Sequence, residues 1–506
     1  GLHSAGVVGN NGTGAFRVYM NMDPQPSHTT PARRFAWIAV CLLIGLAAAL
    51  ALKHRPASEN TPAPAPAVAA APPKLSTEQI LASFPPNPGQ SDTDKALNLA
   101  LEKVRSTPAD ARLWARLGDA LAQKMRDTND ESYFGHAEKA YQQALEIDPK
   151  NLEAITGIAW VKGGRHLFPE SIEWANRALA IDPENAPAHG IAGDAAVEVG
   201  DYEAAFDSYQ KMMDSKPDLS SWSRGAYLLW LTGDTRKAAW LMQKAIAAGG
   251  PFAENTAWCR AKYATMLFHE GAYPAAVQAI QPALQAAPTN TQVLLAAGKI
   301  TAATKDYAAA AKHFQAVVDH APHHDALVGL GDLALIEQDS AAAEKFHAQV
   351  EELSKKHLAV GNHSHIYLAK FYADHDRNLV EALRIAEQSK LTKNVHEADI
   401  LAWVYFKTGD LPKAIEAIKR ALSQGTPDAE IHYHAGMIAA QFGDRQSAQR
   451  HLKRALSLNP QFSLLQSPLA AAALEKLGPQ TANSDVPPPP ADQPAEAPSE
   501  APAEEP

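Results

Sequence analysis

The 506-residue sequence predicts an all-α, superhelical solenoid of two-helix units, with one transmembrane helix near its N-terminus and disordered Pro-rich arms. Three observations predict this fold: a 34-residue period in the body, an uncharged apolar run of 18 residues at 35–52, and the location of 21 of the 36 prolines outside residues 89–478. Because 46% of the residues are hydrophobic and 20% are charged, the body can bury a core. The proline-rich ends cannot, so we expect a folded middle between two arms.

The period is visible in the unit that starts at Ala186. Small residues stand at its eighth and twentieth places (Gly193 and Ala205), a bulky residue at the twenty-fourth (Tyr209) and a proline at the thirty-second (Pro217). Two further units carry the same pattern: Gly298, Ala310, Phe314 and Pro322 in one, and Gly436, Ala448, Leu452 and Pro460 in the other. Small residues fit where two helices cross, bulky ones where the next helix packs, and proline where a helix stops. Each unit is therefore expected to hold two helices.

This pattern resembles the tetratricopeptide repeat family, whose 34-residue unit is a helix-turn-helix. The unit from Ala111 carries Trp114, Leu117 and Gly118 at the W-x-x-L-G places of that family. The resemblance implies ten repeats over residues 111–462. They are expected to start at residues 111, 152, 186, 219, 257, 291, 324, 362, 395 and 429.

The segments beside the repeats are assigned from composition and patterning. The end faces of a solenoid need polar caps, so residues 91–110 and 463–478 are predicted to form capping helices. Residues 53–90 are rich in Ala and Pro, which favours a semi-rigid linker. Residues 1–34 and the Pro-rich tail 479–506, which carries six acidic and no basic side chains, are expected to be disordered.

The apolar run 35–52 is predicted to be a membrane anchor. Eighteen helical residues span about 27 Å, close to the hydrocarbon thickness of a bilayer. Basic residues flank the run on both sides. A cleaved signal peptide is the main alternative, since Ala47-Ala48-Ala49 and Ala49-Leu50-Ala51 offer small-x-small sites, and a buried helix of the fold is another. The run is longer than a usual signal core and ends in a basic cluster, which favours the uncleaved anchor.

The anchor and linker together indicate a location. A short N-terminal arm before one span and a long folded region after it resemble a single-pass protein of a Gram-negative inner membrane, with its body in the periplasm. The basic residues do not decide the orientation, because Arg33 and Arg34 are matched by Lys53 and Arg55. The body itself carries a formal charge of −8, which argues against nucleic acid as a partner.

Catalytic and cofactor motifs are not found in the sequence. It has neither a phosphate-binding Gly-rich loop nor a His-Glu-x-x-His zinc motif, and its two cysteines, Cys41 and Cys259, form no zinc pattern. The group Asp374, His375 and Asp376 is interpreted as solvated or capping residues at a turn between helices. The chain is therefore not expected to be an enzyme, and no cofactor or metal is assigned.

The resemblance implies a surface for partners. In this family the first helix of each repeat lines a concave groove, and at groove-facing places the sequence has Trp160, Tyr227, Trp230, Trp258, Phe268, Trp403, Phe406 and Tyr433. Solvent-facing aromatic residues are not needed for stacking and are typical anchors for a peptide. We therefore expect a membrane-anchored scaffold of the cell envelope, which binds a peptide or helix of another protein in this groove.

Two alternatives stay open. The arrangement of anchor, linker and repeats resembles the repeat-bearing subunits of cytochrome c maturation systems, so the chain could be an assembly factor for cytochrome c. A second alternative is a metal- or haem-handling role, because ten histidines fall within 84 residues: His313, His320, His323, His324, His347, His357, His363, His365, His375 and His396. Their scatter over turns and different helix faces favours surface histidines without a ligand.

Overall fold

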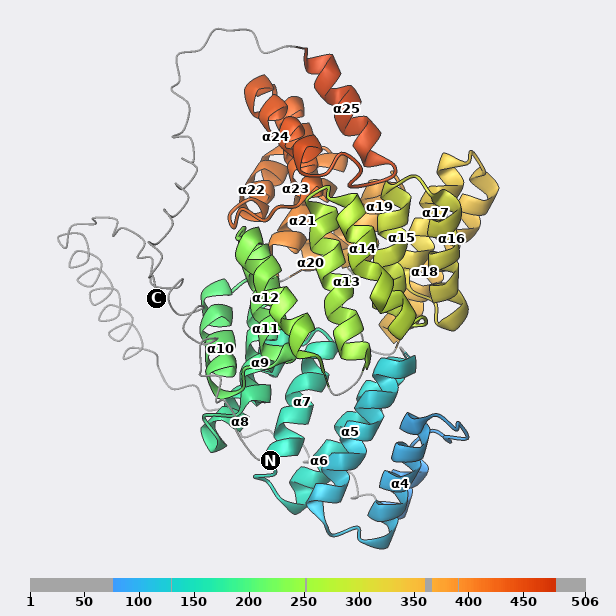
Figure 1. The fold of residues 1–506 in the computed structure, drawn as a ribbon, viewed down its shortest axis with the longest axis vertical. Coiled ribbons are helices and arrows are strands. Elements are labelled where there is room, and N and C mark those ends of the chain that lie inside the picture. The colour runs from blue at the N-terminus through green and yellow to red at the C-terminus, as the bar shows by residue number, and fades with distance from the viewer. Residues whose placement is uncertain (1–75, 129, 251–252, 360–365, 390, 479–506) are drawn as a thin grey trace, which may run out of the picture. The chain divides into compact units, whose positions relative to one another are not determined.

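The computed structural model describes residues 76–478, apart from 129, 251–252, 360–365 and 390. Within this range the regular structure is helical, and no strand is present (Figure 1). None of the helices in the described range is long and apolar enough to cross a bilayer.

Several predicted segments lie outside the described residues. These are the N-terminal arm 1–34, the anchor 35–52, the first part of the linker up to residue 75, and the tail 479–506. Two of the ten clustered histidines, at positions 363 and 365, also lie outside. The anchor therefore stays a prediction from its sequence.

The chain divides into two compact units, one of residues 1–228, 240–250 and 356–364 and the other of the remaining residues. The helices of the first unit are α3 (Thr77–Ala82), α4 (Asp92–Ser106), α5 (Ala111–Thr128), α6 (Ser132–Ile147), α7 (Leu152–Gly164), α8 (Phe168–Ile181), α9 (Ala186–Glu198) and α10 (Tyr202–Ser215). Parts of α11 (Leu219–Leu231) and α12 (Thr235–Ala248) belong to each unit.

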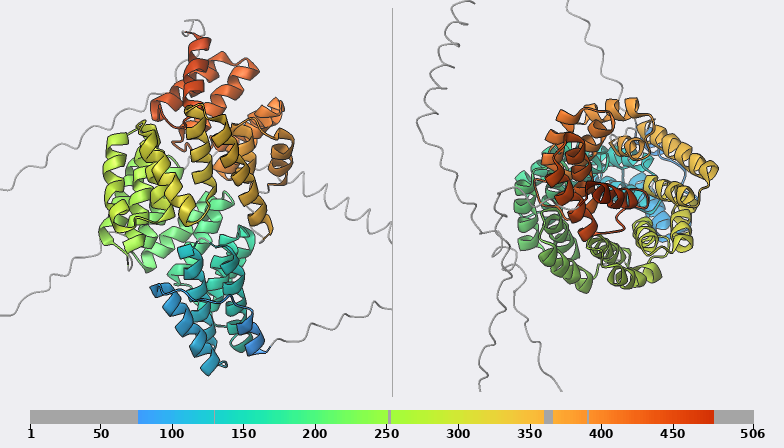
Figure 2. Two further views of the ribbon diagram at one scale, coloured as in Figure 1. Left: turned by 90° about the vertical axis from the view of Figure 1, so that its right-hand side faces the viewer. Right: turned by 90° about the horizontal axis from the view of Figure 1, so that it is seen from above.

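The second unit holds the remaining helices, except for the end of α18 from residue 356, which belongs to the first unit. They are α13 (Ala253–His269), α14 (Tyr273–Ala286), α15 (Thr291–Ala303), α16 (Tyr307–His320), α17 (His324–Ile336), α18 (Ser340–Ala359), α19 (Ile366–Asp374), α20 (Leu379–Gln388), α21 (Val395–Lys407), α22 (Leu411–Ala421), α23 (Ala429–Phe442), α24 (Arg445–Leu458) and α25 (Gln466–Leu477). In Figure 2 successive helices of this unit, such as α13 to α16, pack side by side.

Ten consecutive helix pairs, from α5–α6 to α23–α24, occupy the ten predicted repeats. The first helix starts at the predicted residue in eight of them, while α13 starts at 253 instead of 257 and α19 at 366 instead of 362. The helices α4 and α25 lie within the ranges predicted for the caps. The all-helical repeat architecture is therefore as the sequence indicated.

One helix lies where the sequence predicted an extended linker. Ser76 begins α3 with a capping box, since its side chain accepts from the Gln79 N–H and the Gln79 side chain accepts from the Ser76 N–H. Ile80, Leu81 and Phe84 are buried. Burial of these three apolar side chains holds the segment on the fold, so a linker as far as residue 90 is wrong.

Asparagine and aspartate begin most of the repeat helices. Asn151 starts α7, and its Oδ1 accepts a hydrogen bond of 2.9 Å from the Ala154 N–H. Asn185 and Asn290 start α9 and α15 in the same way. The second helices use Asp201, Asp306, Asp410 and Asp444. Such caps satisfy N–H groups that have no partner within the helix, and they place the start of each helix in the repeat.

A ring pressed between glycines joins one repeat to the next. Tyr141 on α6 is 2% exposed and lies between Gly118 on α5 and Gly157 on α7. A Cβ added to either glycine would stand 2.4 or 2.3 Å from a ring atom, so the helices can pack at this distance only without it. The same arrangement recurs with Tyr209 against Gly193, Phe314 against Gly298 and Gly329, and Leu452 against Gly436.

Within the second unit, turns that are about 190 positions apart in sequence meet. Thr426 Oγ1, at the α22–α23 connection, donates a 2.6 Å hydrogen bond to the carbonyl of Leu231. Asn459 Nδ2, after α24, donates a 2.8 Å bond to the carbonyl of Phe268. Thr426 and Asn459 are both buried, so these bonds are shielded from solvent. The turns of the α11–α12 and α13–α14 pairs are thereby held against the C-terminal repeats.

A buried ion pair in the first unit predicts sensitivity to acid. Asp94 in the first turn of α4 is 4% exposed, and its Oδ1 lies 2.5 Å from Lys124 Nζ on α5. The hydrogen bonds from Lys124 and Ser91 lower the pKa of Asp94 to about 2. Because the folded pKa is below the unfolded one, the pair stabilises the fold above about pH 4 and is lost as the pH falls toward 2.

We expect the amides of α4 and α5 to lose protection from hydrogen exchange in this acidic window, and Asp94→Asn to remove most of that pH dependence. Exchange of variant and parent is compared at the same pH. Asp92→Asn is the matched control, because this carboxylate in the same turn is fully exposed. An unchanged acid response in Asp94→Asn would contradict the assignment.

Candidate functional site on the first helices

The first helices of successive repeats contact one another in each unit. These contacts join α5 to α7 and α7 to α9 in the first unit, and α13 to α15, α15 to α17, α19 to α21 and α21 to α23 in the second. The second helices instead contact the first helix of their own repeat and that of the next. The first helices therefore form a layer of their own in each unit, which is the layer that would carry the groove.

All eight residues predicted to bind a partner lie on first helices. Trp160 is on α7, Tyr227 and Trp230 on α11, Trp258 and Phe268 on α13, Trp403 and Phe406 on α21, and Tyr433 on α23. Half of them are partly exposed, namely Trp160, Tyr227, Trp258 and Phe406. The others are at most 7% exposed: Trp230, Phe268, Trp403 and Tyr433. The expected solvent exposure is wrong for these four.

Neighbouring side chains, some of them from other repeats, pack against these rings. The ring of Trp230 packs on His269 at a centroid distance of 4.9 Å, and that of Tyr433 on Phe462 at 5.6 Å. Phe268 lies against Tyr273 at the start of α14, and its carbonyl accepts from Asn459 after α24. The place of a residue within its own repeat does not reveal contacts with chain that returns from a distant repeat.

Trp403 is the centre of an aromatic stack. Its ring stacks on Phe406 at 5.0 Å and 12° and on His434 at 4.1 Å and 16°. Lys407 Nζ lies 5.2 Å from the same ring. Because Trp403 is buried and Phe406 is partly exposed, Phe406 is the ring of this pair that reaches solvent.

An ion pair supports this stack from behind. His434 is fully buried, and its Nδ1 lies 2.9 and 3.0 Å from the two carboxylate oxygens of Asp399. Burial lowers the pKa of His434, but Asp399 and Glu430 outweigh it and raise that pKa. The imidazolium and the carboxylate thus compensate each other in a place that water does not reach.

Lys370 on α19 links the end of its own helix to α23 through two carboxylates. Its Nζ lies 2.6 Å from Asp374 Oδ2 and 2.6 Å from Glu430 Oε1. Burial raises the pKa of Glu430, yet Lys370 and His434 outweigh it and hold that pKa at about 2. Asp374 also accepts a 2.8 Å hydrogen bond from Gln466 Nε2. The two carboxylates and the ammonium form a compensated network.

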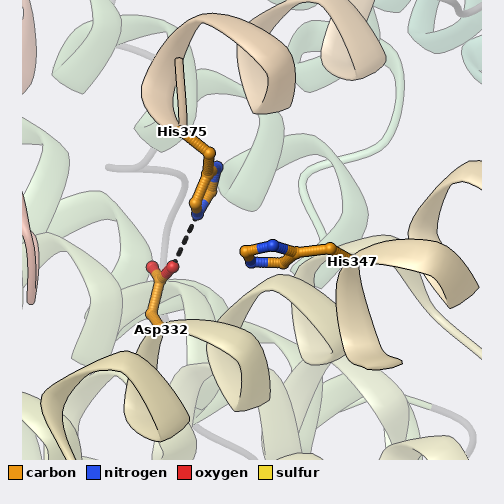
Figure 3. A group of neighbouring side chains, drawn as sticks. All are labelled: Asp332, His347 and His375. Carbon is orange, nitrogen blue, oxygen red and sulfur yellow. Dashed lines mark hydrogen bonds and ion pairs between the residues drawn. The ribbon is translucent and has the colours of Figure 1, made fainter. Parts of the chain in front are cut away.

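A second titratable cluster lies on α17, α18 and the end of α19. It consists of Asp332, His347 and His375, whose ligand atoms lie within 4.8 Å of one another (Figure 3). His375 Nε2 is 2.8 Å from Asp332 Oδ1, and His375 Nδ1 is 2.8 Å from the carbonyl oxygen of Phe371. Since a carbonyl only accepts, Nδ1 carries a proton and Nε2 faces the cluster.

His347 is the unusual member of this cluster. It is 4% exposed, and its Nε2 has no hydrogen-bond partner among the described residues. Burial, with further effects from His375 and Arg377, lowers the pKa of His347 to about 4, so its imidazole is neutral near pH 7. An added Cβ on Gly331 of α17 would lie 2.9 Å from this Nε2, so the glycine leaves room for the ring.

These positions correct two interpretations of the sequence. The view that the clustered histidines lie scattered on the surface is wrong for His347 and His375, whose side chains are both 4% exposed. The view that Asp374, His375 and Asp376 are solvated or capping residues is wrong for Asp374 and His375, which belong to the two clusters above. Asp376 is exposed and pairs with Lys407 on α21 at 2.5 Å.

Sequence reasoning missed Asp332. Its position in the repeat could have identified it. Asp332 is the ninth residue of its repeat, and the resemblance to the family places the ninth residue in the groove. Asp119 and Asp194 hold the same place in their repeats, where they accept from the hydroxyls of Tyr141 and Tyr209. Asp332 is the third aspartate at this place, and its hydrogen-bond partner is His375 instead of a tyrosine.

Comparison with known proteins now decides the family of the repeats. Residues 294–356 and 401–461 match the model of the tetratricopeptide repeat. These two segments are tetratricopeptide repeats. The helix pairs α15–α16, α17–α18, α21–α22 and α23–α24 lie within or overlap the matched segments.

One curated relative of this repeat protein is the formate-dependent nitrite reductase complex subunit NrfG of Escherichia coli O157:H7, 25% identical over 128 residues. The match covers 25% of this chain and spans about three fifths (61%) of the relative.

Solved structures with a related fold include three examples. The APC/C hetero-tetramer Cut9-Hcn1 is 16% identical and covers 76% of this chain and 67% of its own, with a TM-score of 0.44. A thermophilic TPR protein of Thermus thermophilus, TTC0263, is 18% identical over 40% of this chain and 98% of its own, with a TM-score of 0.33. Human IFIT1, solved as a dimer with m7Gppp-AAAA, is 16% identical; the match covers 66% of this chain and 76% of IFIT1, with a TM-score of 0.44.

Proposed function

We propose that the chain is a membrane-anchored scaffold of the cell envelope that binds a peptide or helix of another protein along its first helices. The observation that carries this proposal is the partly exposed aromatic residues on the contacting first helices, with the Trp403–Phe406 stack as the best-built example. Aromatic rings on a rigid base bury much area at little cost in side-chain entropy, and they are frequent anchors of protein interfaces.

The charges on the same helices favour a partner with both polar and apolar groups. Lys407 lies over the Trp403 ring and pairs with the exposed Asp376. Lys299 on α15 pairs with Asp325 on α17 at 3.3 Å, with about half of each side chain exposed. Exposed pairs of this kind exchange partners at low cost and give register more than affinity. We therefore expect specificity from the charges and most of the binding energy from the rings.

The test is crosslinking in membranes followed by identification of the captured proteins, with Trp258→Ala combined with Phe406→Ala. We expect the variant to capture its partners at least about tenfold less, the loss typical of anchor residues at an interface. Trp240→Ala is the matched control, because this tryptophan is 44% exposed but lies on the second helix α12. If the double variant and the control captured the same proteins in the same amounts, the proposed surface would be wrong.

Anchoring through residues 35–52 and a periplasmic body are part of the same proposal. The uncharged run and its basic flanks support the anchor, and the short arm before the run and the long folded region after it support the periplasmic body. We expect the chain to stay with membranes after alkaline extraction, and an alkaline phosphatase fused after residue 478 to be active. Release of the chain by alkali would contradict the anchor, and an inactive fusion would contradict the orientation.

The second candidate is an assembly factor for cytochrome c. It is favoured by the similarity to a subunit of a formate-dependent nitrite reductase complex and by the predicted order of anchor, linker and repeats. Deletion of the chain would then lower covalently bound haem in membrane fractions, as seen by haem staining. Unchanged staining would remove this candidate and leave the general scaffold.

A further inference from the structure

We propose that Asp332, His347 and His375 form a binding site for one divalent transition-metal ion of the zinc type. Two imidazole nitrogens and one carboxylate oxygen, all within 4.8 Å of one another, come from α17, α18 and the end of α19 (Figure 3). Two histidines and one acidic residue are a frequent ligand set for such ions, and they leave one position for water. A metal bound here would join two consecutive repeats.

The orientation of His375 fits a metal ligand. Its Nδ1–H donates to the carbonyl of Phe371 at 2.8 Å, which fixes the ring and directs Nε2 at the cluster. Backbone carbonyls hold metal-binding histidines in this way in many proteins. Nε2 now shares a 2.8 Å hydrogen bond with Asp332, and two ligands of a tetrahedral zinc ion stand about 3.4 Å apart, so a small separation of the pair admits the ion.

The Nε2 of His347, unpartnered within the part of the chain that the structure describes, is a second, independent observation that favours a metal ion. A side chain that is 96% buried normally finds a partner for each polar atom, yet its Nε2 has none among the described residues and faces the Asp332–His375 pair. A His–Asp pair alone explains His375 and Asp332 but leaves this nitrogen unexplained. A metal ion takes up all three groups.

The nearby cluster of Asp374, Glu430 and His434 does not qualify in the same way. Its three ligand atoms are also within 4.8 Å, but Lys370 Nζ lies 2.6 Å from both carboxylates and supplies the positive charge there. Within the described residues, the cations that face the proposed site are neutralised elsewhere: Lys370 by this cluster, and Arg377 by Glu344 at 2.6 Å. A dication at Asp332 therefore meets no uncompensated positive side chain.

The experiment is calorimetric titration of the full chain, freed of metal by a chelator, with ZnCl₂, and with CoCl₂ as an optical reporter of tetrahedral coordination. We expect one tight site, and a weakening of at least about tenfold in Asp332→Asn and in His347→Gln. Gly331→Ala keeps every ligand but places a methyl group against the His347 ring, so it should weaken binding as well. Binding of Zn²⁺ only above about 100 µM would overturn the proposal.

Two control variants separate this site from other histidines. His320→Ala removes an exposed imidazole of α16, and Glu430→Gln removes a ligand atom of the Lys370 cluster; both should keep the tight site. The melting temperature without metal shows whether each variant folds, and Zn²⁺ should raise it in the parent but not in His347→Gln. Equal Zn²⁺ binding in the parent and the ligand variants, or loss in the Glu430→Gln control alone, would overturn the assignment.

Discussion

Replacement of Tyr141 by alanine is expected to lower the free energy of unfolding of the surrounding helices by about 3–5 kcal/mol, as truncation of a fully buried aromatic residue does. The ring is 2% exposed and fills the space that Gly118 and Gly157 leave open between α5 and α7. Neither glycine has a side chain that could close the cavity. The loss should appear as faster hydrogen exchange of the amides of α5, α6 and α7.

Tyr141→Phe is the matched control. It keeps the ring and loses only the 2.7 Å hydrogen bond to Asp119 Oδ1, whose residue stays in contact with solvent. Its cost should therefore stay near 1 kcal/mol. If the phenylalanine variant lost as much protection as the alanine variant, the hydroxyl and not the ring between the glycines would be the main contact.

This contact also shows what the sequence could predict. Gly118 and Tyr141 stand at the eighth and a shifted twenty-fourth place of their repeat, and the period requires a small residue opposite a bulky one. The prediction is reliable because the contact lies within one repeat and recurs in several others. Caps such as Asn151 follow from the same logic, since each helix must start at a fixed distance from this crossing.

The site was less predictable because it depends on contacts between repeats. Asp332, His347 and His375 lie 15 and 28 positions apart, on α17, on α18 and directly after α19, and the packing of these helices brings them together. Trp230 and Phe268 were expected at solvent, yet turns some 190 positions away cover this region. A helical period shows which side of a helix faces inward. It does not show which distant segment packs there.

Removal of the Asp399 carboxylate is expected to be the most costly single change near the aromatic stack. Asp399→Ala would leave His434, which is fully buried, without the carboxylate to which its Nδ1 is hydrogen-bonded. Breaking a buried pair by deleting one partner costs about 3–5 kcal/mol, because the remaining charge is neither hydrated nor compensated. The cost should be seen as earlier urea unfolding of the second unit, followed by hydrogen exchange in α21 and α23.

Two further variants separate the loss of the Asp399 charge from the loss of its side-chain volume. Asp399→Asn keeps an acceptor for His434 Nδ1–H, so a neutral imidazole is satisfied and the cost should be clearly smaller than in Asp399→Ala. The double change Asp399→Leu with His434→Leu removes both charges, and it should be less destabilising than the sum of the two single leucine variants. Strict additivity would mean that the pair is not coupled. In that case packing and not the ion pair would hold the Trp403 ring, and the stack of Trp403 with Phe406 should persist in all of the Asp399 and His434 variants.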